Sequence, residues 1–236
     1  MNILKKIWLN RWMLRSIFST IYFNLYYLPF KQAIKLPILL YKPHLINVNR
    51  GGVKIQSNKI HFGMIRLGFP QVSIYPNSGI IWDNRGMRVF HGSCAIGNAS
   101  AISIGETGTV DFGDFFGAST AFKLICYHKV TFNDQVLLGW ENLVTDTDFH
   151  TLTKVSGGYT KGYAPVSIGK NNWFGMKCIT LKGTHTPDYC TVGANTVLNK
   201  KYDFPPYSII AGNPAKLKTT GYYRDMKNNK VEYPNA

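Results

Sequence analysis

The sequence predicts an all-β domain wound as a coil of triangular cross-section, preceded by a helical segment. Two observations predict this fold class: apolar residues recur every six positions through the C-terminal half, and a basic stretch with helical spacing opens the chain. The chain has 236 residues, of which 45% are hydrophobic and 14% aromatic. That length and composition suffice for one large folded domain and exclude wholesale disorder.

Residues 1–30 are expected to form an amphipathic helix that ends at Pro29. Its apolar positions are spaced by four and three residues: Leu14, Phe18, Ile21, Leu25 and Leu28. Polar residues interrupt the apolar run, which is therefore shorter than the ~20 residues that span a bilayer. Basic and aromatic side chains accompany it, as suits an anionic membrane surface: Lys5, Lys6, Arg11, Arg15, Trp8, Trp12, Tyr22, Tyr26 and Tyr27. Docking of the helix on its own domain or on a neighbouring subunit is the alternative.

The net charge of +15 is concentrated at the N-terminal end of the chain. Eleven Lys and Arg residues precede Asp83, which is the first acidic residue. A nucleic-acid-binding protein usually carries its excess charge on the folded body, so we expect no nucleic-acid partner. The four cysteines are far apart without zinc-site spacing, which favours reduced thiols and a cytoplasmic protein, with residues 1–30 peripheral on the inner membrane face.

A period of six residues is the strongest signal in the chain. Each step is interpreted as one side of a triangle that points a single apolar residue inward, and stacked coils bury these residues against one another. Glycine follows several of these positions, where the chain must turn. The positions in register are Ile96 and Ile102; Ile104, Val110 and Phe116; Phe132, Leu138 and Val144; and Ile168, Phe174, Thr180, Thr186, Val192 and Leu198.

The predicted organisation has three parts: a helical segment over 1–45, a coil over 46–218 and a tail over 219–236. Lys31–Pro43 is interpreted as a connector, because prolines punctuate it. The register slips between Phe116 and Phe132 and again after Thr151, and the Gly-, Lys- and Tyr-rich stretch 151–165 is predicted to be a protruding loop. A β-sandwich with chance periodicity is the alternative fold.

Two segments resemble the hexapeptide-repeat acyltransferases, whose fold is a left-handed parallel β-helix. Val166–Lys218 ends in Phe204-Pro-Pro-Tyr-Ser-Ile-Ile-Ala-Gly-Asn-Pro-Ala-Lys, which is similar to that family's closing signature. Leu143-Val-Thr-Asp-Thr-Asp-Phe-His150 resembles the catalytic-histidine segment of members that modify bacterial surface sugars, such as the maltose- and galactoside-type O-acetyltransferases. Thr180, Thr186 and Pro187 depart from the usual repeat, so an imperfect coil is expected there.

The resemblance implies a homotrimeric O-acetyltransferase that uses acetyl-CoA and no metal. The acceptor would be a sugar hydroxyl of a bacterial surface or secreted polysaccharide, or of its precursor. An antibiotic or amino-sugar N-acetyltransferase of the same fold and a non-catalytic solenoid that binds a partner remain alternatives. A zinc carbonic anhydrase with this coil would need three convergent histidines, for which the sequence shows no spacing.

His150 is the predicted general base among six histidines, because it precedes the long loop and imidazole suits proton transfer near pH 7. Asp146 and Asp148 could orient its ring or bind a sugar hydroxyl, although turn formation explains them equally well. Trp140 and Glu141 are candidates for sugar contact, with packing as the alternative for Trp140. His185 is interpreted as structural, whereas His91 and His128 stay open as members of a second site.

The donor site rests on the resemblance alone. In the family, the pantetheine arm runs along the stacked coils between two subunits and is bound by backbone groups at the turns. Lysines suit the phosphates of coenzyme A as point charges. The matching positions in this chain are Gly175, Met176, Ala194, Asn199, Lys200 and Lys216.

Overall fold

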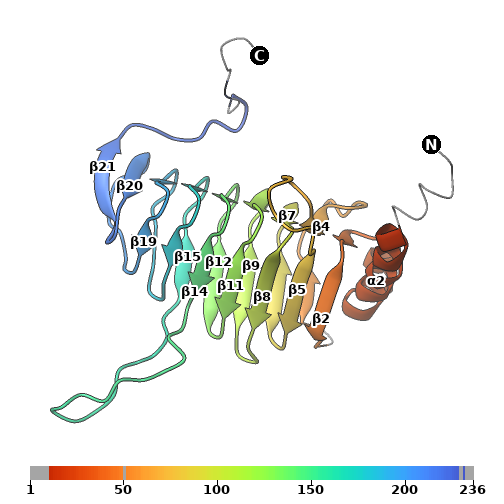
Figure 1. Cartoon of the computed structure of the whole chain (residues 1–236), viewed down its shortest axis with the longest axis horizontal. Helices are drawn as coiled ribbons and strands as arrows, with labels where there is room; N and C mark the ends of the chain where they lie inside the picture. The colour runs from red at the N-terminus through yellow and green to blue at the C-terminus, as the bar shows by residue number, and fades with distance from the viewer. Residues whose placement is uncertain (1–10, 50–51, 229–230, 232–236) are drawn as a thin grey trace.

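The computed structural model describes residues 11–49, 52–228 and 231, and the side chains from residue 16 onward. Lys5, Lys6 and Trp8 therefore lie outside the described residues, as do the side chains of Arg11, Trp12, Leu14 and Arg15. In the described part the chain forms a long coil of short strands, with a helix across one end and a hairpin-like arm near the other (Figure 1).

Three parallel sheets form the faces of the coil. Sheet A contains β1 (Ile38–Leu40), β4 (Ile65–Phe69), β7 (Cys94–Gly97), β10 (Phe116–Ala118), β13 (Leu137–Leu138), β16 (Trp173–Phe174), β18 (Thr191–Val192), β20 (Ser208–Ala211) and β21 (Lys216–Thr220). Sheet B contains β2 (Pro43–Asn47), β5 (Ile80–Asn84), β8 (Ser100–Ile104), β11 (Lys123–Cys126), β14 (Leu143–Thr145), β17 (Ile179–Thr180) and β19 (Val197–Leu198). Sheet C contains β3 (Val53–Ile55), β6 (Met87–Phe90), β9 (Thr109–Phe112), β12 (Lys129–Phe132) and β15 (Val166–Ile168).

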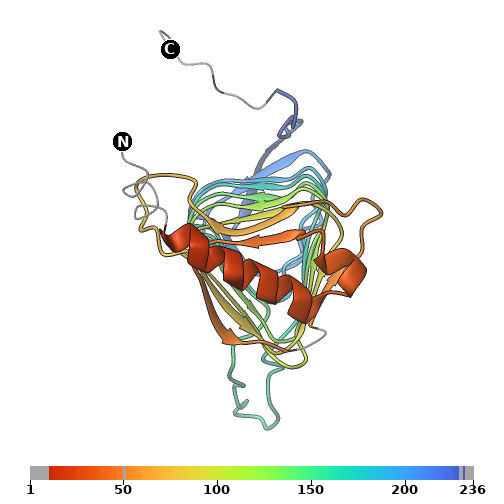
Figure 2. The same cartoon turned by 90° about the vertical axis from the view of Figure 1, so that its right-hand side faces the viewer.

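The chain visits the sheets in the fixed order A, B, C, so each strand pairs with the equivalent strand one coil away. Viewed along the coil from its N-terminal end, successive strands run counter-clockwise while the chain recedes (Figure 2). The fold is therefore the left-handed parallel β-helix that the resemblance implies. General handedness rules for parallel crossovers favour the opposite hand.

The period of six is confirmed as the inward-facing set of the coil. Phe174 aligns with Val192 across β16 and β18, and Thr180 aligns with Leu198 across β17 and β19. Both pairs are 18 residues apart, which is three steps of six and one complete coil. All the positions in register are buried. Aromatic rings continue the interior, where Phe112 stacks between Phe90 and Phe132 at centroid distances of 5.0 and 5.7 Å.

The corners of the coil repeat a left-handed backbone conformation at residues other than glycine. We call the turns between sheets the AB, BC and CA corners. At the AB and CA corners, φ lies between 52° and 65° at Ala99, Ala121, Glu141, Lys177 and Asn195, and at Phe115, Gln135, Asn171, Tyr189 and Tyr207 respectively. Such residues are uncommon and each costs conformational energy, which the stacked coils must offset.

The coil is irregular where the sequence departs from the repeat. Beyond β15, sheet C continues only as isolated bridges from Ser167 to His185 and from His185 to Lys201. Thr186 is nevertheless buried, and its hydroxyl accepts a hydrogen bond from the Gly169 amide at 3.1 Å. The inward threonine therefore bonds the backbone of the preceding coil where other positions pack an aliphatic side chain.

Helix α2 (Arg11–Tyr27) lies across the open N-terminal end of the coil, and the short α3 (Phe30–Ala33) follows it (Figure 2). The helix docks with its polar face inward: Ser16, Thr20 and Asn24 are buried. The stripe predicted from the spacing is mostly outward, because Phe18 is 74% exposed and Leu25 is 52% exposed. Only the C-terminal end of the helix packs its apolar side chains inward, through Phe23, Tyr27 and Leu28. The helix is therefore docked on its own domain, as the alternative states, but it packs mainly through its polar face and not through the predicted apolar stripe.

The boundaries of the coil differ from those predicted. Strand β1 begins at Ile38, inside the segment 31–43 that the sequence analysis interprets as a connector. Sheet A ends with β21, which pairs antiparallel to β20 and runs to Thr220, beyond the predicted end at 218. The tail then turns back over the CA corners, where Arg224 donates to the Gln135 carbonyl at 2.6 Å. Among the described helices, none has the length and apolar character needed to cross a membrane.

Candidate active site

An arm projects from the coil at the BC corner (Figure 1), and His150 lies near its base, three residues beyond Thr147. The arm replaces the turn between β14 and β15. Two antiparallel bridges, Thr147 to Tyr163 and Thr153 to Tyr159, fold it back on itself like a hairpin. The loop predicted over 151–165 is therefore an ordered projection. The His150 side chain is exposed, and within the described residues its ring makes no hydrogen bond.

Aromatic contacts hold the base of the arm against the preceding coil. The Phe149 ring packs on Tyr127 at 4.9 Å between centroids, and Tyr163 packs on His128 at the same distance. Lys161 lies 4.6 Å from the centre of the Tyr163 ring. These contacts hold the residue before His150 and the opposite strand of the arm against the preceding coil, and the imidazole itself is exposed.

Asp146 is a buried corner residue, and it turns away from His150. Its carboxylate accepts hydrogen bonds from the backbone amides of Tyr127 at 2.9 Å and His128 at 2.8 Å. The thiol of Cys126 lies 3.2 Å from the same carboxylate, and this contact adds to burial in raising the pKa of Cys126. Both carboxylate oxygens are thus occupied by the preceding coil. The turn-forming alternative explains Asp146 better than a catalytic role.

Asp148 is exposed and forms an ion pair with Lys182 of the next coil. Neither aspartate hydrogen-bonds the His150 ring, so the orienting role predicted for them is not realised within one chain. Lys182 was not singled out from the sequence. Its partner is 34 residues away, and such a pairing leaves no local pattern in the sequence.

Trp140 and Glu141 lie at the AB corner, at the opposite end of β14 from His150. The Glu141 carboxylate accepts a hydrogen bond from the hydroxyl of Tyr75, which raises the pKa of that phenol, and lies 3.7 Å from the ammonium of Lys177. The Tyr75 ring also packs on Trp140 at 6.3 Å between centroids. Packing thus accounts for part of the Trp140 surface. Tyr75 and Lys177 are further polar groups of this corner that no pattern in the sequence singled out.

The predicted donor positions divide between corners. Gly175, Met176 and Ala194 stack at the AB corner, where a Cβ on Gly175 would lie 2.7 Å from the Ala194 amide nitrogen. A side chain would not fit in this close approach, which explains the glycine. The turns of successive coils stack tightly at this corner. Asn199 and Lys200 belong to the BC corner, where the Lys200 carbonyl accepts from His185 at 3.3 Å. The exposed Lys216 begins β21.

The remaining histidines do not join His150 in a cluster. His91 lies at the CA corner and its Nε2 is 3.3 Å from the Asp111 carboxylate, as in an exposed ion pair. His185 is exposed on the face of sheet C. Within the described residues, no group of three His, Cys, Asp or Glu side chains is placed to hold a metal ion.

Comparison with known proteins relates segments of this chain to acetyltransferases. No family model matches the chain. A Staphylococcus aureus (strain Mu50) protein provisionally named an acetyltransferase is 40% identical over 60 residues, which are 25% of this chain and 29% of that protein. A Mycobacterium tuberculosis protein with the same provisional name is 31% identical over 126 residues, or 52% of this chain and 40% of that protein. Both relatives are named acetyltransferases, which agrees with the acyl-transfer reaction that the resemblance implies.

These relatives are matched only in part. A provisionally named acetyltransferase of Schizosaccharomyces pombe is 32% identical over 108 residues, which are 45% of this chain and 51% of that protein. The chain thus spans about half or less of the length of these relatives. Among solved structures, the polySia-specific acetyltransferase NeuO is 13% identical, with a TM-score of 0.49 over 83% of this chain and 91% of that one. A maltose O-acetyltransferase of Clostridium difficile 630 is 15% identical, with a TM-score of 0.31 over 86% of this chain and 82% of that one.

Proposed function

We propose that the protein is an acetyl-CoA-dependent O-acetyltransferase that acts on a sugar hydroxyl of a bacterial surface or secreted polysaccharide, or of its precursor. The observation that carries the proposal is the exposed imidazole of His150 next to Phe149, which packs on the coil, within the segment that resembles the family's catalytic histidine. The relatives provisionally named acetyltransferases support the same reaction class.

In the proposed reaction, neutral His150 accepts the proton of the acceptor hydroxyl as its oxygen attacks the thioester carbonyl. The tetrahedral intermediate then expels the thiolate of coenzyme A, and protonated His150 returns the proton to that sulfur. No covalent enzyme intermediate forms. General-base catalysis of this kind contributes a factor of ~10²–10⁴ to the rate.

The two corners of sheet B support a site shared between subunits. Gly175, Met176 and Ala194 lie at the AB corner, whereas His150 lies at the BC corner of the same sheet. Within one chain, these three predicted donor positions and the predicted base therefore lie at opposite edges of sheet B. We infer that the AB corner of one subunit faces the BC corner of its neighbour, as in the homotrimer that the resemblance implies. Lys200 and Lys216 would then be candidates for the phosphates of the donor.

We also propose that the protein associates with the inner face of the cytoplasmic membrane through its N-terminal end. The outward face of α2 carries the exposed side chains of Phe18 and Leu25, and no acidic residue precedes Asp83. Such a basic, apolar surface suits anionic lipid headgroups. A membrane-carried sugar precursor would be presented at that surface.

The deciding experiment measures acetyl-CoA binding by calorimetry and sugar-dependent release of coenzyme A, for the native protein and for His150→Ala. We expect His150→Ala to lose at least about 100-fold in rate and to keep donor binding. His185→Ala is the matched control, since that histidine is also exposed on the coil. Full activity of His150→Ala would contradict the proposed base, and a folded native protein without donor binding would contradict the reaction class. Transfer to amino sugars alone would favour the N-acetyltransferase alternative.

A further inference from the structure

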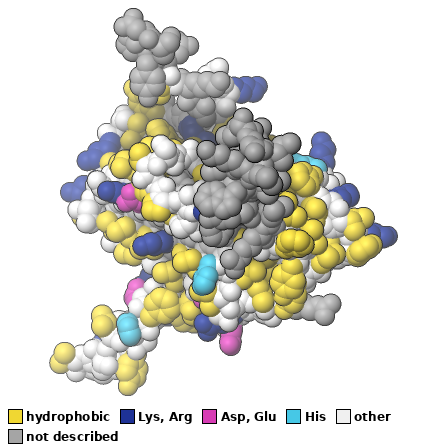
Figure 3. All heavy atoms as spheres, turned by 45° about the vertical axis from the view of Figure 1, so that its right-hand side comes forward, with side chains coloured by type: hydrophobic (Ala, Val, Ile, Leu, Met, Phe, Trp, Pro, Cys, Tyr) yellow, Lys and Arg dark blue, Asp and Glu magenta, His cyan; other side chains and the backbone are white. Residues whose placement is uncertain are grey.

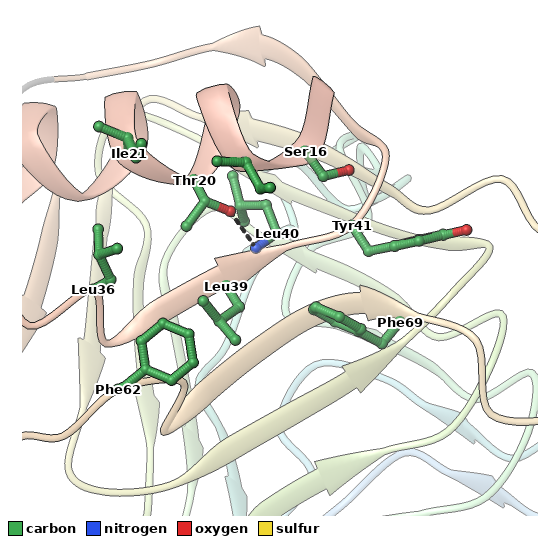
Figure 4. Close-up of a pocket in the computed structure, with 10 residues that line it drawn as sticks. Ser16, Thr20, Ile21, Leu36, Leu39, Leu40, Tyr41, Phe62 and Phe69 are labelled. Atoms are coloured by element: carbon green, nitrogen blue, oxygen red, sulfur yellow. Dashed lines mark hydrogen bonds between the residues drawn. The ribbon is translucent and has the colours of Figure 1, made fainter. Parts of the chain in front are cut away.

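A groove runs between helix α2 and the first strands of sheet A, beside the hydrogen bonds that join α2 to β1 (Figure 4). Its volume is about 560 Å³, within the range of sites that hold small molecules. Ile17 and Ile21 line it from the helix, Leu36 and Leu39 from the segment that leads into and through β1, and Phe62 and Phe69 from the β4 side. The groove is distant in the fold from His150, which lies at the base of the arm (Figure 1).

The polar side chains in the groove wall already have hydrogen-bond partners within the chain. The Thr20 hydroxyl accepts a hydrogen bond from the Leu40 amide at 3.0 Å, and the Ser16 hydroxyl accepts from the Lys42 amide at 3.1 Å. The Tyr41 hydroxyl accepts from the Asn77 side chain at 2.9 Å. What the groove offers a ligand is therefore apolar surface, which favours a hydrocarbon over a polar molecule.

The surroundings of the groove combine exposed apolar side chains with basic charge. Phe18, Phe30 and Phe62 are 74%, 72% and 66% exposed, and they belong to α2, α3 and the segment before β4. Hydrophobic side chains gather toward this end of the molecule with Lys and Arg among them, whereas the visible acidic side chains lie elsewhere (Figure 3). A second copy docked here would bring two strongly basic ends together, whereas an anionic lipid would neutralise them.

We propose that this groove binds one hydrocarbon chain of an anionic membrane lipid, with the lipid headgroup held at the basic rim. The inference rests on the membrane association proposed above and adds a defined site for the chain. Lys35 directly precedes the lining residue Leu36, and Lys42 directly follows Tyr41, where its ammonium also donates to the Asn77 carbonyl at 2.8 Å. The exposed apolar face of α2 would lie at the membrane surface, while the groove takes up a single chain from it.

Monomeric alkyl phosphates below their micelle concentration test the site directly. The probes are octyl, decyl and dodecyl phosphate, with inorganic phosphate as the headgroup alone, and binding is measured by calorimetry. Each methylene that enters the groove should strengthen binding up to about fourfold. The gain in affinity should stop once the alkyl chain is longer than the groove, and one ligand should bind per protein molecule. Equal binding of inorganic phosphate, or a gain without limit and without stoichiometry, would overturn the proposal.

Two tryptophan substitutions on the same helix separate the groove from the surface. Ile21→Trp places the ring in the groove, whereas Leu25→Trp adds the same bulk to the exposed face outside it. We expect Ile21→Trp to weaken decyl phosphate binding at least tenfold and Leu25→Trp to leave it unchanged. Equal binding by the two variants would contradict the groove as the site.

Vesicles of 30% phosphatidylserine distinguish this proposal from membrane association itself. Both tryptophan variants should still bind them, because tryptophan suits the membrane interface. If the native protein binds vesicles but not monomeric alkyl phosphates, the groove proposal is overturned and the membrane proposal is retained. If it binds monomeric alkyl phosphates but not vesicles, the groove is retained and the membrane proposal is overturned. If the native protein dimerises and Ile21→Trp abolishes the dimer, the lipid proposal is overturned and the groove is instead occupied by a second copy of the protein.

Discussion

The side-chain amide of Asn24 brackets the peptide groups of Ile38 on the outermost strand of sheet A. Its Nδ2 donates to the Ile38 carbonyl at 2.7 Å, and its Oδ1 accepts from the Ile38 amide at 3.1 Å. Asn24 thus supplies the hydrogen bonds that a further strand would supply. Together with Thr20 and Ser16, it covers the exposed edge of the first coil, and uncovered sheet edges are sites of aggregation.

Asn24→Leu should destabilise the fold by about 2–4 kcal/mol, because two buried peptide groups of Ile38 lose their partner while the volume is kept. Denaturant unfolding measures this change. Leu25→Asn, on the exposed face of the same helix, is the matched control and should stay within about 0.5 kcal/mol of the native protein. Equal stability of Asn24→Leu and the control would show that the edge does not depend on the helix.

The two aspartates before His150 should respond differently to alanine. Asp146→Ala leaves the amides of the half-buried Tyr127 and His128 without an acceptor, which costs about 2–5 kcal/mol of unfolding free energy. Asp148→Ala breaks an exposed pair with Lys182 and should cost at most about 1 kcal/mol. Thermal and urea unfolding compare the two variants. A larger loss for Asp148→Ala would contradict the structural role assigned to Asp146.

The four cysteines should resist alkylation in the folded protein. All four are buried and free, and burial raises the pKa of Cys190 to about 12. The thiolate of Cys190 is then about 1000-fold rarer at pH 8 than that of an ordinary thiol of pKa ~9. Iodoacetamide labelling followed by mass spectrometry should therefore modify all four only in denaturant. An introduced thiol at the exposed Lys201 is the control, and native labelling of Cys190 at a similar rate would refute the prediction.

The same thiol predicts a pH dependence of stability. Because the folded-state pKa of Cys190 lies above the unfolded value, the folded protein retains the proton while the unfolded chain loses it. This contribution to stability is fully present below about pH 9 and is lost as pH rises toward 12. Cys190→Ala should therefore flatten the fall in unfolding free energy between pH 8 and pH 10.5. If the unfolding free energy falls with pH at the same slope in the native protein and in Cys190→Ala, this prediction is wrong.

Association with anionic vesicles should depend on the outward face of α2. Phe18→Asp and Leu25→Asp should each weaken sedimentation with phosphatidylserine vesicles at least tenfold, and salt should weaken native binding because it screens the basic charges. Val155→Asp, the same kind of change on the exposed arm, is the control. Deleting the helix is unsuitable, since it would also uncover the edge of β1. Vesicle binding that neither Phe18→Asp nor Leu25→Asp weakens would contradict the outward face of α2 as the membrane-binding surface, and a native protein that does not bind the vesicles would remove the membrane proposal.

The inward positions of the coil could be predicted from the sequence because the inward residue of each side is a local property. Side chains alternate between inward and outward along each short strand, so the inward aliphatic or aromatic residues recur from side to side without reference to distant parts of the chain. Phe174 and Val192 are the clearest pair, predicted at the same inward position and aligned in neighbouring strands. The segment at His150 could likewise be singled out, because its residues are contiguous.

Which face of α2 packs inward was decided only by the tertiary structure. Helical spacing predicts an apolar stripe, but the first coil presents unpaired peptide groups as well as apolar surface, and only Ser16, Thr20 and Asn24 can bond those groups. The pairing of Asp148 with Lys182 of the next coil also depends on how coils stack. The sequence by itself determined the repeat and the chemistry of its residues, whereas contacts between distant coils decided which residues meet, since that choice depends on the register of the stack.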